Sequence, residues 1–156
     1  MSILEALSHK LACHGAGMLA GGRGKPELTA SDVAAMLAGL GRGPVALAYA
    51  KLAGDVGAAR EVYAILHVTA SDWSRLEQWQ VPAGSERVGK LARLVRDDLI
   101  LPRPLLGGRK AAGLMGITQW GWRVEWKSRH ARLLAVGMDW ECDLERRLRQ
   151  ELRHVG

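Results

Sequence analysis

The stretch KAAGLMGITQWGWRVEWKSR, Lys110 to Arg129, carries the most specific local pattern in this chain of 156 residues. Ala112 is a small residue at a point where two crossing helices can approach closely, Gly116 lies in a turn between two apolar residues, and Thr118 can cap the helix that follows. This order of residues is typical of a DNA-binding helix-turn-helix. We therefore expect two helices joined by a tight turn.

The second of these helices has an inward and an outward stripe, because successive side chains on a helix are separated by about 100°. Trp122, Trp126 and Leu133 share one stripe and are expected to pack inward. The chain has six Trp and no Phe, so we interpret Trp122 and Trp126 as the core of the motif. The neighbouring stripe carries Gln119, Arg123, Lys127 and His130, with Trp120 at its edge.

The outward stripe is the predicted DNA-binding face. In a major groove Arg123 matches guanine and Gln119 matches adenine through paired hydrogen bonds, whereas other basic side chains meet phosphates. The dipole at the Thr118 end of the helix also favours a phosphate. Trp120 has two open roles, contact with DNA or packing on the connector PRPLLGG, residues 102–108. The full predicted set is Arg109, Lys110, Thr118, Gln119, Trp120, Arg123, Lys127, Arg129, His130 and Arg132.

The excess positive charge of the chain is confined to one window that includes this motif. The net charge is +6, and residues 84–132 hold eleven basic and four acidic side chains, whereas the rest of the chain is close to balanced. Such a patch is the usual electrostatic footprint of nucleic-acid binding, although a solvated face has the same composition. We therefore divide the chain into a helical part, residues 1–83, with a surface free for a protein partner, and a basic DNA-binding part, residues 84–156.

Composition and periodicity predict an all-α protein, because Ala and Leu are abundant and β-branched residues are sparse. Ser71 and Asp72 are expected to open a short helix of their own. In a long closing helix, Leu144, Leu148 and Leu152 recur every fourth position and are expected to pack on the rest of the protein, with self-association as the alternative. The other expected helices span residues 2–12, 31–40, 45–53, 58–68 and 85–100, and a glycine-rich stretch spans residues 15–26.

No catalytic, cofactor or metal site is indicated. The histidines have no partner at nucleophile or metal-ligand spacing, and Asp97 and Asp98 are adjacent, so they lie on diverging helix faces. Cys13 and Cys142 show no metal or disulfide pattern and are expected to be reduced thiols. The sequence shows neither a signal peptide pattern nor an apolar run of membrane-spanning length, so we expect a cytoplasmic protein without membrane contact.

Two parts of the chain resemble the phage lambda Q-type late antitermination proteins. LTASDVAAMLAGLGRGPVALAYAKLAGD, Leu28 to Asp55, is similar to the N-terminal part of that family. The stretch that contains Trp120, Trp122, Trp126 and Trp140, with the Leu- and Arg-rich tail after it, is similar to its C-terminal part. Many members carry a cysteine-rich zinc-binding insertion between the two parts, and here the cysteine-free connector LPRPLLGGRK stands in its place.

The resemblance implies a protein of a bacterial host cell that binds double-stranded DNA at a phage late promoter. It implies contact with bacterial RNA polymerase through the flap and sigma-factor regions, after which the polymerase ignores terminators. Two other functions remain open. A plain helix-turn-helix repressor or activator, dimeric through the closing helix, would occupy a palindromic site. A helical adaptor would bind only protein, with its basic window facing an acidic partner.

Overall fold

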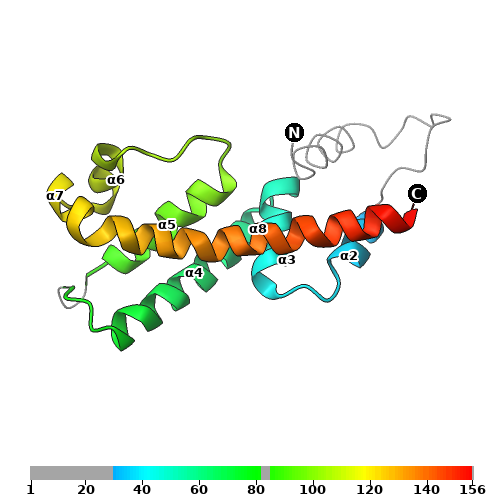
Figure 1. The fold of residues 1–156 in the computed structure, drawn as a ribbon, viewed down its shortest axis with the longest axis horizontal. Helices are drawn as coiled ribbons and strands as arrows, with labels where there is room; N and C mark the ends of the chain where they lie inside the picture. The colour runs from blue at the N-terminus through cyan, green and yellow to red at the C-terminus, as the bar shows by residue number, and fades with distance from the viewer. Residues whose placement is uncertain (1–29, 82–84, 156) are drawn as a thin grey trace.

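The computed structural model describes residues 30–81 and 85–155, so the expected helix over residues 2–12 and the glycine-rich stretch lie outside the described residues. Within those two ranges the chain forms helices and no strand, which confirms the all-α class. Figure 1 shows one long helix, α8 (Lys127–Val155), running along the molecule with the shorter helices packed against it.

The C-terminal half of α8 packs against two short helices, α2 (Ala30–Leu37) and α3 (Arg42–Ala53). Leu144 is 0% exposed and Leu148 is 2% exposed in this contact. The residues around them are Val33, Met36, Leu37, Ala48 and Leu52. The closing helix therefore packs on its own chain, as expected, and this contact covers Leu144 and Leu148, which a dimer seam would use.

Close contacts join α8 to the two short helices. The guanidinium of Arg147 donates to the carbonyl oxygen of Met36 at 3.1 Å, so α8 satisfies a carbonyl group at the end of α2 that has no partner within its own helix. At Gly43 in the first turn of α3, an added Cβ would lie 2.4 Å from a ring carbon of Trp140. Only a glycine lets α3 approach the indole this closely.

α4 (Val56–Leu76) is one continuous helix where two were expected. It begins after Asp55, whose carboxylate accepts a hydrogen bond from the backbone N–H of Ala58 at 3.0 Å. Ser71 and Asp72 do not open a new helix, because the buried face of α4 continues up to them and holds that part of the chain in helical register. The buried face consists of Val62, Leu66 and Ala70.

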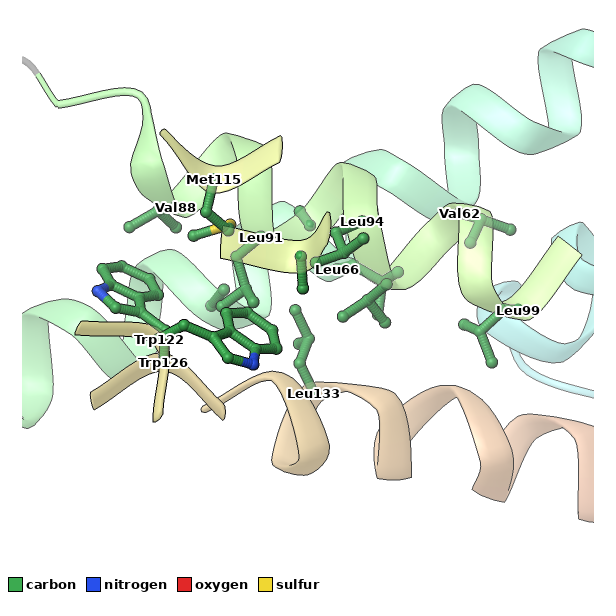
Figure 2. Close-up of a cluster of buried hydrophobic side chains, with 14 of the residues drawn as sticks. Val62, Leu66, Val88, Leu91, Leu94, Leu99, Met115, Trp122, Trp126 and Leu133 are labelled. Carbon is green, nitrogen blue, oxygen red and sulfur yellow. The ribbon is translucent and has the colours of Figure 1, made fainter. Parts of the chain in front are cut away.

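α5 (Arg87–Ile100) lies at the centre of the main core and confirms the expected helix. Its predicted stripe is buried throughout and consists of Val88, Leu91, Ala92, Val95 and Leu99. α8 crosses it at Gly137, where an added Cβ would lie 2.2 Å from a methyl carbon of Leu99. The main core draws on helices from both sides of residue 84, and Figure 2 shows Val62 and Leu66 in the same cluster as Leu91 and Leu133.

Candidate nucleic-acid interface

A helix, a glycine turn and a second helix follow the connector at the expected positions. The first helix, α6 (Gly108–Met115), ends at Gly116, whose φ of +67° lies in the left-handed region that favours glycine. The second begins as α7 (Gln119–Gly121). The hydroxyl oxygen of Thr118 accepts a hydrogen bond from the backbone N–H of Gly121 at 3.0 Å, so the expected cap is present.

The inward stripe of the second helix forms part of the main core. Trp122 is 6% exposed, Trp126 is 1% exposed and Leu133 is fully buried, which confirms the expected packing. Figure 2 shows both indole rings pointing toward α5 and Met115. At Gly108 an added Cβ would lie 3.3 Å from the ring of Trp122, so the start of α6 also lies directly against this indole.

The second helix contains a π-helical turn that the sequence did not predict. It is η1 (Trp122–Trp126), and the backbone N–H of Lys127 donates to the carbonyl oxygen of Trp122, five residues earlier. The chain then continues without a break into α8. A π turn holds one more residue than an α turn and often marks a functional site. Trp122 and Trp126, at the two ends of this turn, both enter the core from one side of the helix.

A groove of about 570 Å³ runs between the connector and the second helix, and we call it the basic groove. Its connector wall consists of Leu105, Leu106, Gly107, Gly108 and Arg109. Its helix wall consists of Gln119, Trp122, Arg123, Lys127, His130, Ala131 and Leu134. The four residues of the predicted outward stripe thus meet at one groove, and Arg109 joins them from the opposite wall.

Three cations of the basic groove have no counter-ion. Arg109, Arg123 and Lys127 form no ion pair with any residue in the described ranges, and no Asp or Glu lines the groove. The arginines farther along α8 differ, since Arg146 and Arg149 each pair with an acidic residue of the same helix. Arg129 and Arg153 of the same helix also form no ion pair within the described residues, so the groove holds two of its four unpaired arginines and lysines, Arg123 and Lys127.

Arg129 and Arg132, two of the residues predicted to contact DNA, lie outside the basic groove and contact other side chains of the protein. The guanidinium of Arg129 lies 4.3 Å from the ring centre of Trp79 and 4.8 Å from that of Trp126. Burial lowers the pKa of this guanidinium below its usual value, and the charges of Glu125 and Glu77 oppose that shift. Arg132 lies 3.9 Å from the ring centre of Trp73 and donates to both carboxylate oxygens of Glu77 at 2.7 Å.

These contacts join the end of α4 and the segment after it to the start of α8. A guanidinium over an aromatic face and a carboxylate held by two hydrogen bonds are both specific, stabilising contacts. Arg129 and Arg132 therefore lie against the end of α4 and the segment after it, on a different side of the helix from the basic groove.

His130 has an acidic partner that sequence spacing could not reveal. Its Nε2 lies 2.7 Å from the carboxylate of Asp98, whose side chain is only 1% exposed, and Arg103 completes the cluster at 3.2 Å. Asp97 instead pairs with Arg96 and is 35% exposed, so the adjacent aspartates do lie on diverging faces. The pair forms because α5 and α8 pack together, although Asp98 and His130 are 32 positions apart.

The remaining predicted residues are on the open surface around the turn. Thr118, Gln119 and Lys110 are exposed, and Lys110 lies at a neighbouring hollow that it shares with Arg109. Trp120 is 69% exposed, so it does not pack on the connector. Val124, one turn later, is 54% exposed. The indole of Trp120 is therefore free to contact a partner.

In residues 30–81 and 85–155 no helix is both long and apolar enough to cross a membrane. The same ranges contain no cluster of three or more His, Cys, Asp or Glu side chains placed to hold a metal ion. Comparison of the chain with protein-family models, curated proteins and solved structures found no match.

Proposed function

We propose that this protein is a non-enzymatic transcription factor that binds double-stranded DNA through the start of its second helix, and that it acts as a late-type antiterminator in the cytoplasm of a bacterial host. The observation that carries the DNA-binding part is the set of three unpaired cations, Arg109, Arg123 and Lys127, around a groove without acidic residues. Cations held close together without counter-ions repel one another and gain free energy when phosphates neutralise them.

The positions of the side chains suggest which of them contact base edges and which contact phosphates. Trp120 lies exposed in the first turn of the second helix, which is where recognition helices contact base edges. The exposed Gln119 beside it also lines the basic groove. Arg109, Arg123 and Lys127 supply the phosphate contacts, with Lys110 beside them. Arg129 and Arg132 already have partners in the protein, so we assign them to the support of the interface rather than to DNA. His130 is held by Asp98 and also lines the groove.

The antitermination role rests on the resemblance of residues 28–55 and of the Trp-containing C-terminal part to that family. The positions of the two similar stretches support this proposal. Helices α2 and α3, which belong to the first stretch, pack directly on α8, which belongs to the second. The two stretches belong to one body in which a neutral end is available to RNA polymerase and a basic end is available to DNA. The connector, which stands in the place of the zinc module, forms one wall of the groove.

The DNA-binding proposal is tested by the salt dependence of duplex affinity. We expect log affinity to fall linearly with log salt, and neutralising Arg109, Arg123 and Lys127 as Gln should flatten the slope by about 2.7, because each phosphate contact contributes about 0.9. The matched control replaces Arg146, Arg149 and Arg153 with Gln, which removes the same charge from the far end of α8. Equal effects in both variants, or affinity without salt dependence, would refute the assignment.

The antitermination role has a separate test. In a purified transcription system with the cognate promoter, the protein should let RNA polymerase read through a downstream terminator, and the groove variant should lose this effect while the control variant keeps it. Binding to the template without readthrough would leave the protein as a plain DNA-binding regulator. A footprint on one asymmetric site is expected, because Leu144 and Leu148 are covered within the chain and are not available as a dimer seam.

A further inference from the structure

The geometry points to a second role for the basic groove, as a site for one unpaired nucleotide of a DNA strand. The nucleotide would place its phosphate among Arg109, Arg123 and Lys127 and its sugar and base on the apolar lining between the two walls. This inference rests on the proposed nucleic-acid function and deepens it. It assigns an unpaired nucleotide to the groove and leaves paired DNA to the exposed turn.

The shape of the groove is the first argument. A DNA major groove is about 12 Å wide, and a helix with its side chains already measures about 10–12 Å across. The groove-facing side of the second helix has the connector opposite it, so helix and connector together are too wide to enter a major groove. Side chains inside the groove therefore meet a single strand rather than the edges of paired bases, whereas Trp120 lies outside it.

The size and lining of the groove are the second argument. Its volume of about 570 Å³ is far larger than one phosphate needs and falls in the range of about 300–1,000 Å³ that is typical of small-molecule sites. Both walls contribute apolar surface, from Leu105 and Leu106 on one side and from Ala131 and Leu134 on the other. A site for phosphate alone would not need this surface, but a nucleotide combines an anionic group with a flat, weakly polar ring.

Polar groups at the groove also fit a base. The Gln119 carboxamide both donates and accepts hydrogen bonds, as base edges do. His130 is held in place by its 2.7 Å contact with Asp98, and its ring lies 5.4 Å from that of Trp122, so two rings whose orientation is fixed line the groove. The carboxylate of Asp98 is only 1% exposed and lies against His130 and Arg103, and it is not part of the groove lining.

The decisive experiment compares two labelled DNA probes of identical sequence, one fully paired and one with a single unpaired nucleotide in an otherwise paired duplex. The unmodified protein should bind the second probe about tenfold more tightly by fluorescence anisotropy, since one base held on a protein surface typically contributes that much. Ala131→Met should weaken this preference, because the longer side chain covers part of the apolar lining and narrows the groove without changing the charge. Ala135→Met is the matched control, one turn along the same exposed face but outside the groove lining, and should retain it.

A second measurement distinguishes binding of a whole nucleotide from binding of phosphate alone. We expect NMR signals of the His130 ring and the Trp122 indole to shift with the unpaired probe and with a deoxynucleoside monophosphate, and much less with inorganic phosphate. Equal affinity for the two DNA probes overturns the inference but leaves duplex binding standing. Shifts produced equally by inorganic phosphate overturn it as well, because they reduce the site to a phosphate cradle. Loss of binding to both probes refutes the proposed function itself.

Discussion

The turn between α6 and α7 can be tested with two identical substitutions that should have opposite effects. Gly116 has a φ of +67°, and an Ala in this left-handed conformation costs about 1–2 kcal/mol. The nearest atom to an added Cβ is the Lys90 ammonium nitrogen at 3.3 Å, which is the end of a flexible side chain and can move away. The cost of Gly116→Ala therefore comes from the backbone and should be close to that range.

Gly113→Ala is the matched control, three residues earlier in the same helix. Its φ is not positive and an added Cβ meets nothing within 4 Å, so Ala should stabilise the protein by about 0.5–1 kcal/mol through its higher helix propensity. For a chain of this size the melting temperature should fall by about 3–6 °C for Gly116→Ala and rise by about 1–3 °C for Gly113→Ala. Thermal and urea unfolding followed by circular dichroism measure both. Shifts of the same sign would show that the chain does not turn at Gly116 as described.

Two further pairs of substitutions test the structural contacts around the interface. Asp98→Ala should destabilise the protein by about 1.5–3 kcal/mol in urea unfolding, because it leaves His130 and Arg103 without a buried charged partner. The neighbouring Asp97→Ala should cost less than about 1 kcal/mol, since its ion pair is partly exposed, and equal costs would contradict the burial of Asp98. Trp126→Ala should cost about 3–5 kcal/mol because the side chain is 1% exposed. Trp120→Ala should stay within about 0.5 kcal/mol of the unmodified protein, and a loss of stability there would mean that the exposed indole is packed.

Local sequence was sufficient for much of the fold, because each feature depends on neighbouring residues. The stripe of α5 was predicted residue by residue, since apolar side chains at helical spacing have only one way to be buried together. The turn at Gly116 and the cap at Thr118 were predicted for the same reason, as both rely on backbone groups within a few positions. The gathering of Gln119, Arg123, Lys127 and His130 on one face also followed from helical geometry.

The predicted local structure was wrong where contacts between segments far apart in the chain determine how the backbone folds. Ser71 and Asp72 have the local chemistry of a helix start, yet α4 continues through them because its buried face is held by the core. The π turn at Trp122–Trp126 was likewise not predicted, because the expected spacing assumed regular α-helical turns.

The sequence by itself determined that the chain is helical, where its glycine turn lies and which cations share a helix face, because these follow from contacts within a few residues. Only the tertiary structure decided which of those cations are free. Arg129 and Arg132 acquired partners within the protein when the end of α4 placed Trp73, Glu77 and Trp79 beside them, and His130 acquired Asp98 from α5. Arg109, Arg123 and Lys127 remained unpaired because the wall opposite the helix carries no carboxylate, and charge balance of this kind depends on packing between segments far apart in the chain.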